Sequence, residues 1–190
     1  KEDITAQKKA EQELVLAKQK AEENGIKLKE TLDEALQKKL EIAALLEAAK
    51  EIPLSDSFTD CAQKIFDICK NAIGAKSGYV ALLAEDGSEN EVLFLDAGGL
   101  PCTVDPELPM PIRGLREVAY RNNDCAFDND FMHSEWVKFM PPGHVKLDNV
   151  LFAPLIINKK AVGLIGLANK DGGFTENDAE LANAFGNLAS

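Results

Sequence analysis

Residues Asp148–Ala184, DNVLFAPLIINKKAVGLIGLANKDGGFTENDAELANA, decide the fold of this chain. Two apolar runs, Val150–Ile157 and Ala161–Ala168, flank the polar triplet Asn158-Lys159-Lys160. Apolar runs of this length around a short polar turn predict a β-hairpin. Because the runs are apolar at nearly every position, we expect both faces of the hairpin to be covered by other elements.

The residues after the hairpin predict a closing helix. Asn169-Lys170 leaves the second apolar run, two glycines and Phe174 follow, and Thr175 has Asp178 three positions later. Threonine is a good N-cap residue, and an acidic side chain in the first turn suits the positive end of the helix dipole. We therefore predict that a helix begins at Thr175 and packs against the sheet.

Upstream of the hairpin, helical and extended patterns alternate. Pro53 breaks a long helical pattern, and Ser55 or Asp56 is expected to cap a second helix that runs through Ala72 and ends near Gly74. The cysteines of this helix lie on its apolar face, so we expect them in the core. The other predicted elements are strands at Ser77–Ala84 and Glu91–Ala97, a proline-rich loop after Gly98, a short helix at Gly114–Asn122 and a short strand at Cys125–Asp128.

The segment from Thr5 to Glu51 has one glycine and no proline, and its alanine, glutamate, lysine, leucine and glutamine content favours a single long helix. Apolar residues recur every seven positions, as in a coiled coil, and we expect a register shift near Gly25. A helix this long cannot bury its apolar stripe on one small domain, which favours a parallel homodimer over a solvated single helix. The predicted dimer seam is Leu14, Ala21, Leu28, Ala35 and Ile42.

The charge distribution limits the classes of partner. Residues 1–52 contain 10 basic and 12 acidic side chains, and the remainder contains 11 basic and 20 acidic ones, for a formal net charge of -11. An acidic globular part without clustered lysine or arginine argues against nucleic acid as a partner. No apolar run is long enough to cross a bilayer. The four cysteines lack metal-ligand spacing, so we predict no metal site and expect reduced thiols in a cytoplasmic setting.

Residues 127–147, here called the cover segment, have an unusual composition. They contain both histidines, the only tryptophan, three phenylalanines and two of the three methionines, and we expect a short helix from Ser134 to Met140 between loops. Aromatic and methionine side chains on an irregular segment are typical of an apolar ligand pocket, although such a lid can also fill its own cavity. The candidate pocket residues are Phe94, Phe127, Phe131, Trp136, Phe139, His144 and Leu147.

The order of these elements resembles the GAF domain, an α+β fold with a six-stranded antiparallel sheet and flanking helices. The resemblance covers residues 40–190, which leaves residues 1–39 as a coiled-coil signalling helix. Asn169, Lys170, Phe174 and Asp178 are similar to the N-K…F-x3-D-E signature of many GAF domains, with Ala179 in place of the final glutamate. In that family the signature accompanies cyclic-nucleotide binding. We interpret these four residues as a structural clasp in which a Lys170–Asp178 ion pair holds the closing helix to the last strand.

The first residues carry a second resemblance. Asp3-Ile4-Thr5 and the charged helix that follows are similar to the end of a PAS sensor domain. This similarity implies that a PAS domain precedes the segment in its parent protein. A PAS-helix-GAF order implies a sensor histidine kinase of a two-component system, with diguanylate cyclase or phosphodiesterase outputs as alternatives.

Known chemistries of the family fit this chain poorly. Free methionine sulfoxide reductases use cysteines on this fold. Cys102 matches the first of them, but Leu115 and Leu147 stand near the places of the others, so a disulfide cycle lacks its partners. No cysteine directly precedes His133 or His144, which argues against a bilin, whereas haem ligation by either histidine stays open. We predict a non-catalytic sensory domain that binds a small ligand under the cover segment and relays through dimeric helices. The alternatives are a structural dimerisation module and a haem-based redox or gas sensor.

Overall fold

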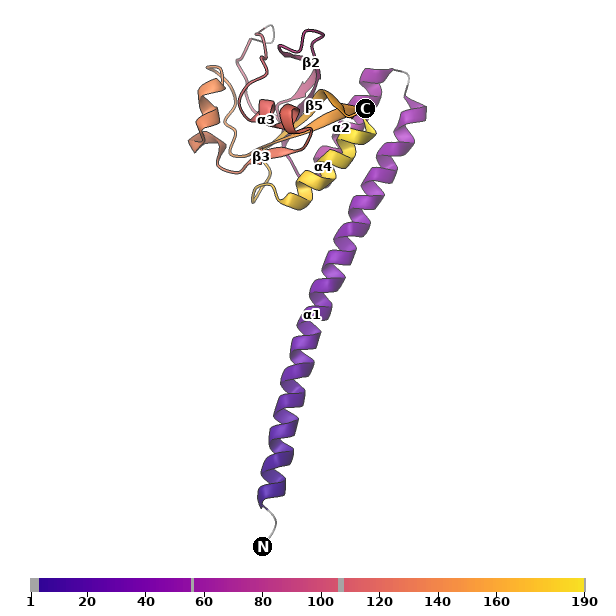
Figure 1. Ribbon diagram of the computed structural model, residues 1–190, viewed down its shortest axis with the longest axis vertical. Helices are drawn as coiled ribbons and strands as arrows, with labels where there is room; N and C mark the ends of the chain where they lie inside the picture. The colour runs from indigo at the N-terminus through magenta and orange to yellow at the C-terminus, as the bar shows by residue number, and fades with distance from the viewer. Residues whose placement is uncertain (1–3, 56, 106–107, 190) are drawn as a thin grey trace. The chain divides into compact units, whose positions relative to one another are not determined.

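The computed structural model describes residues 4–55, 57–105 and 108–189 and divides into two compact units, Lys1–Ile42 and Ala43–Ser190 (Figure 1). The first unit consists of helix α1 (Ile4–Glu51) up to its boundary with the second unit. The apolar side chains along it are exposed, including Leu14 and Leu28 of the predicted dimer seam. Asp3, the first residue of the PAS-like motif, lies outside the described residues. In the part of the chain that is described, no helix is long and apolar enough to span a membrane.

The second unit follows the predicted order of elements. After a 3-10 turn η1 (Ile52–Leu54) come α2 (Phe58–Ile73), β1 (Ser77–Leu83), β2 (Asn90–Asp96), α3 (Leu115–Asn122), β3 (Ala126–Asp128), η2 (Phe131–His133), η3 (Glu135–Phe139), β4 (Val150–Ile157), β5 (Lys160–Ala168) and α4 (Glu176–Leu188). The short helix predicted from Ser134 to Met140 is the 3-10 turn η3.

The strands form one antiparallel sheet in the order β2-β1-β5-β4-β3. The described residues therefore contain five strands rather than the six expected from the family resemblance. Beside the start of β2, the chain forms only an isolated bridge between Glu89 and Pro111. Proline has no backbone N–H to donate to a ladder, and both Pro109 and Pro111 lie in this segment, which explains why pairing stops after one bridge.

The central hairpin has the predicted strands and a tighter turn. Asn158 and Lys159 both have positive φ, 49° and 67°, and Lys160 already pairs with Ile157 as the first residue of β5. A two-residue loop with two left-handed residues is the turn that matches the twist of antiparallel strands. β4 is buried over its first six residues and β5 over its last six, so both faces of the hairpin are covered as predicted.

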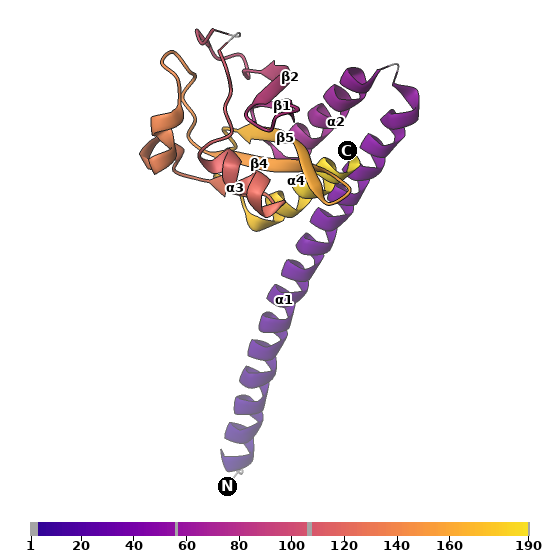
Figure 2. The ribbon, with the colours of Figure 1, turned by 45° about the horizontal axis from the view of Figure 1, so that its top comes forward.

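Side chains alternate between two faces of this sheet. On one face, Leu151, Ile165 and Leu167 pack with α2, α4 and the last turns of α1, where Ala48 is fully buried. We call this the helix face. Helices α2 and α4 lie side by side in both views (Figures 1 and 2). On the other face, Val150 and Phe152 pack with α3 and the cover segment, and we call it the α3 face.

The helix ends show why the elements stop where they do. The N-cap of α2 is Ser57, whose hydroxyl accepts a hydrogen bond from the Asp60 amide at 3.1 Å, so Ser55 is not the cap; Asp56 lies outside the described residues. Gly74 ends this helix with φ of 83°, a conformation that glycine adopts without strain. Helix α4 has the predicted start, with Thr175 as its N-cap, and Thr175 and Asp178 form a capping box there.

Candidate functional site

The α3 face gathers residues from several parts of the chain. Its buried cluster contains Leu115 and Ala119 of α3, Phe131 of η2, and apolar residues of β4 and β5. The cover segment lies against the start of α3, because a Cβ atom added at Gly114 would come within 2.9 Å of the Phe139 ring and 3.6 Å of the Trp136 ring. Trp136 and the other partly buried side chains pack on the same cluster: Tyr79, Val118, Tyr120, Ala126, Met132, Met140 and Leu147.

The structure brings together only some of the predicted pocket residues. Phe131, Trp136 and Leu147 belong to the α3-face cluster, and Phe139 contacts its edge through Gly114. Phe94 and Phe127 lie on the helix face, where Phe94 meets Phe66 edge-on with ring centroids 5.3 Å apart. These two phenylalanines therefore lie on the opposite face of the sheet from Phe131, Trp136 and Leu147. Successive side chains of a strand point to opposite faces of the sheet. In β3 the neighbouring Ala126 faces α3, so Phe127 faces the other way.

A polar group that the sequence analysis missed lies on the α3 face. The Tyr120 hydroxyl donates a 2.6 Å hydrogen bond to Asn90 Oδ1. Among the described residues, the buried Nδ2 of Asn90 has no hydrogen-bond partner. Burial raises the pKa of Tyr79, and the charge of Arg116 together with a hydrogen bond from its side chain partly offsets that increase. Burial, and then the neighbouring Tyr79, raise the pKa of Tyr120. These residues come from three elements, so no local motif marks them.

The four clasp residues surround the entry to α4. Lys170 and Asp178 form the predicted ion pair, with side chains 20% and 9% exposed. The same Asp178 oxygen accepts hydrogen bonds from the Thr175 amide at 2.8 Å and the Thr175 hydroxyl at 2.9 Å. Phe174 is buried in the helix-face core. One carboxylate thus connects the end of β5 with the first turn of the closing helix.

Three asparagines extend these connections to the cover segment. Asn129 holds the Phe174 backbone at both its N–H and its C=O, at 2.7 and 2.8 Å. Asn149 holds the backbone of Lys170 in the same two-point way, at 2.9 Å each. Asn169 accepts from the Asp148 amide and donates to the Lys146 carbonyl. We call these contacts the asparagine clamps; the sequence analysis identified only Asn169 of the three. Both ends of the cover segment are therefore tied to the loop that leads into α4.

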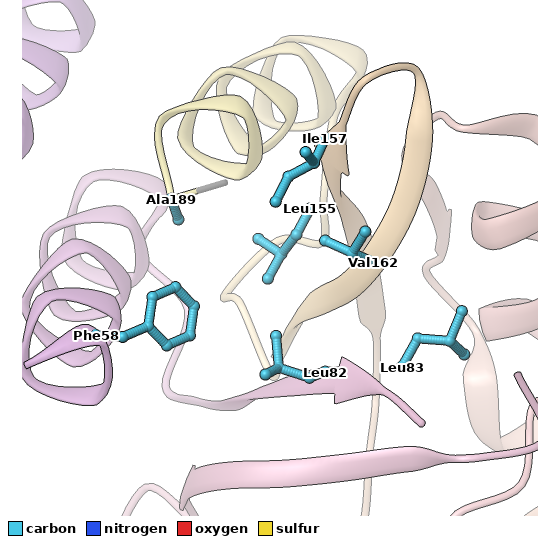
Figure 3. Close-up of a pocket in the computed structure, with 7 residues that line it drawn as sticks. All are labelled: Phe58, Leu82, Leu83, Leu155, Ile157, Val162 and Ala189. Atoms are coloured by element: carbon cyan, nitrogen blue, oxygen red, sulfur yellow. The ribbon is translucent and has the colours of Figure 1, made fainter. Parts of the chain in front are cut away.

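An apolar pocket of about 340 Å³ lies on the helix face, away from the cover segment. Phe58 of α2 faces the ends of β1, β4 and β5 across it, as Figure 3 shows. The lining side chains are all apolar: Phe58, Leu82, Leu83, Leu155, Ile157, Val162 and Ala189. Specific small-molecule sites contain a few polar groups that orient the ligand, and these side chains provide none.

The cysteines and histidines differ in their surroundings. Cys69 is fully buried, and this burial raises the pKa of its thiol. Burial, together with the charges of Asp124 and Glu176, raises the pKa of Cys125 to about 12. Thiols in such surroundings stay protonated and unreactive, whereas Cys102 is exposed. His133 is 82% exposed and pairs with Asp130, a position that does not fit an axial haem ligand in an enclosed apolar cleft. His144 is half-buried, with Nδ1 2.8 Å from the Val145 carbonyl oxygen. No group of three or more potential metal-ligating side chains occurs within the described ranges.

Comparison with known proteins agrees with this architecture. Residues 55–190 match the family model of the GAF domain. A search of curated proteins found no match. Among solved structures, the GAF domain of an Acinetobacter phosphoenolpyruvate-protein phosphotransferase superimposes with a TM-score of 0.66 at 17% identity, covering 78% of this chain and 89% of that one.

Two further structures show how widely the fold is used. Free methionine-R-sulfoxide reductase from Neisseria meningitidis, in complex with its substrate, has a TM-score of 0.59 at 16% identity, over 77% of this chain and 83% of that chain. A GAF domain/HD domain protein from Geobacter sulfurreducens has a TM-score of 0.56 at 14% identity, over 70% and 90%. At these identities the structures establish the fold alone. With the family model covering most of its length, the chain belongs to the GAF domain family, a sensory and regulatory fold.

Proposed function

We propose that this chain is a non-catalytic sensor module that binds a small molecule on the α3 face, under the cover segment, and transmits the bound state to α4. The observation that supports this proposal is the set of asparagine clamps. Asn129 lies near the start of the cover segment and holds the Phe174 backbone. Asn149 lies just after the end of the segment and holds the Lys170 backbone, and Asn169 holds Lys146 and Asp148 at that end. Asn129 and Asn149 bind the loop between β5 and α4, and Asn169 belongs to that loop. A displacement of the cover segment should therefore displace the loop as well.

In the remaining steps of the proposed signal, α4 acts on α2 and α1. Helix α4 shares the helix-face core with α2 and with the last turns of α1 through Phe185, Cys69 and Ala48. A shift of α4 therefore acts on residues that pack against α1. Parallel dimerisation through the seam Leu14, Ala21, Leu28, Ala35 and Ile42 would carry that shift along two helices, since these side chains otherwise expose apolar surface to water. We propose that the parent is a PAS-linked signalling protein, most simply a histidine kinase, with residues 1–39 as the signalling helix.

The competing function is a structural dimerisation module without a ligand. Phe131 favours it, because this cover side chain is 8% exposed and packs in the α3-face cluster, as expected of a lid that fills its own space. The two functions differ in whether any small molecule changes the cover and α4 together.

The test combines a thermal-shift screen of metabolites with hydrogen–deuterium exchange of the hits. We expect a stabilising compound to slow exchange in residues 127–147 and in the first turn of α4 at the same time. In Asn129→Ala the cover should still be protected while the α4 response is reduced. Asn183→Ala, which removes an exposed hydrogen bond to Asp124, is the matched control and should respond as the unmodified chain does. The sensor proposal fails if no compound protects the cover segment, or if protection of the cover never reaches α4.

A further inference from the structure

The apolar pocket on the helix face takes no part in the proposed sensor function. Its volume of about 340 Å³ lies at the lower end of the range for small-molecule pockets, which is about 300–1,000 Å³. Leu155 in its wall is 1% exposed, whereas Phe58 on the α2 side and Ile157 on the strand side are 52% and 44% exposed (Figure 3). The pocket therefore extends from the buried core to the surface, where an apolar chain can enter it.

A lysine lies beside the pocket, on the same face of the sheet. Lys160, the first residue of β5, pairs with Ile157 across the hairpin. Directly opposed residues of antiparallel strands point to the same face, with Cβ atoms about 5 Å apart. Since Ile157 lines the pocket, the Lys160 side chain leaves the sheet next to the pocket. Lys160 is exposed, and within the described residues neither it nor Lys159 forms an ion pair.

The α2 side of the pocket has the opposite charge balance. Lys64 of α2 pairs with Asp60 at 3.2 Å and with Glu51 at 3.3 Å, so two carboxylates share one ammonium group there. An anionic group at the pocket entrance is therefore repelled from α2 and attracted to the hairpin turn. The occupant that fits has an apolar chain with a single negative charge at one end.

We propose that this pocket binds the alkyl chain of a medium-chain fatty acid, with the carboxylate at the ammonium group of Lys160. The chain provides most of the affinity, because every lining side chain is apolar and each buried methylene contributes. The lysine contributes less, because an exposed ion pair is weak in water. This site is separate from the ligand site proposed under the cover segment, which lies on the α3 face.

Titration calorimetry with hexanoate, octanoate and decanoate, each below its critical micelle concentration, tests the chain. We expect octanoate to bind saturably, and its affinity to exceed that of hexanoate by about fourfold for each added methylene. Phe58→Ala removes a half-exposed wall of the pocket and should weaken octanoate binding about tenfold. Leu54→Ala removes an apolar side chain that is 69% exposed and is not part of the lining, so it should bind octanoate as the unmodified chain does.

A second pair of variants tests the carboxylate. Lys160→Gln should weaken octanoate binding by about two- to fivefold and leave the binding of 1-octanol unchanged. Lys76→Gln removes an exposed lysine just before β1, at the opposite end of that strand from the pocket residues Leu82 and Leu83, and should change neither.

Several results overturn the inference. They are an absence of saturable octanoate binding, an affinity that does not rise with chain length, and equal behaviour within either pair of variants. Light scattering of Phe58→Ala identifies the competing occupant, since a change of oligomeric state without fatty acid binding would assign the pocket to a second copy of the chain. None of these results bears on the sensor proposal, which depends on protection of the cover segment and α4.

Discussion

The Lys170–Asp178 ion pair provides the sharpest test of the clasp. Lys170→Met removes the ammonium group and keeps most of the aliphatic stem, which isolates the charge from the packing. In the unmodified chain the two side chains are 20% and 9% exposed. The variant leaves a carboxylate that is nearly out of reach of water and has lost its counter-charge.

The expected loss in free energy of unfolding depends on how well Asp178 is still solvated and hydrogen-bonded in the variant. Breaking a fully buried ion pair costs about 3–5 kcal/mol. Here the lysine retains some contact with solvent, and Asp178 keeps two hydrogen bonds from Thr175, so we expect a loss of about 2–3 kcal/mol. For a domain of this size that loss lowers the melting temperature by about 5–10 °C.

The chain contains a matched control. Lys76 and Asp171 form an ion pair of the same chemistry between the segment before β1 and the loop before α4, but their side chains are 58% and 87% exposed. An exposed pair contributes about 0–1 kcal/mol, so Lys76→Met should lower the melting temperature by at most about 3 °C. Scanning calorimetry of both variants measures the difference, and a double-mutant cycle with Asp178→Asn isolates the pair. If Lys170→Met and Lys76→Met melt within about 2 °C of each other, burial does not set the strength of the clasp and the reasoning is refuted.

Three further predictions follow from other parts of the chain. Asn129→Ala removes both contacts to the Phe174 backbone and should cost about 1–3 kcal/mol in urea unfolding, while Asn183→Ala should cost less than about 0.5 kcal/mol; equal losses would contradict a role for the clamp. Leu28→Glu places a charge in the predicted seam and should convert the proposed dimer into a monomer in light scattering, whereas Lys29→Glu, one position outside the seam, should not; a chain that is monomeric without substitution would rule out the coiled-coil dimer. Burial raises the pKa of the Cys125 thiol from 9.0 to about 12, so the unfolded state loses its proton first and the free energy of unfolding falls as pH rises above 9.0. Cys125→Ser should reduce that slope by about 1.4 kcal/mol per pH unit, and an unchanged slope would show that the thiol is not buried in solution.

The order of elements was predictable because it depends on short-range patterns. Apolar runs, turn residues and helix caps act within a few positions, and they located all five strands and the four main helices to within a few residues. The Lys170–Asp178 pair was predictable for the same reason, since the two residues lie eight positions apart across one loop. The turn at Asn158 was predicted one residue too long, because apolar periodicity does not show which flanking residue joins the ladder.

The face on which each aromatic residue lies was not predictable from the same patterns. Alternation along a strand separates Phe127 from Ala126, but it does not say which of the two meets α3. That depends on sheet order, in which β1 pairs with β5 across more than eighty residues of sequence, and on the handedness with which helices cover the sheet. For this reason the sequence did not show that Phe94 lies on the helix face, apart from most of the other candidate pocket residues.

The sequence by itself determined the family, the hairpin, the closing helix and the ion pair at its start, because each depends on neighbours in the chain. Only the tertiary structure decided that Asn129 and Asn149 tie the cover segment to the entry of α4, and that the Tyr120 hydroxyl meets Asn90. These residues come from strands, helices and loops whose proximity is set by long-range pairing. A hydrogen bond between segments far apart leaves no periodic signal in either of them, so these contacts became visible only once the sheet was assembled.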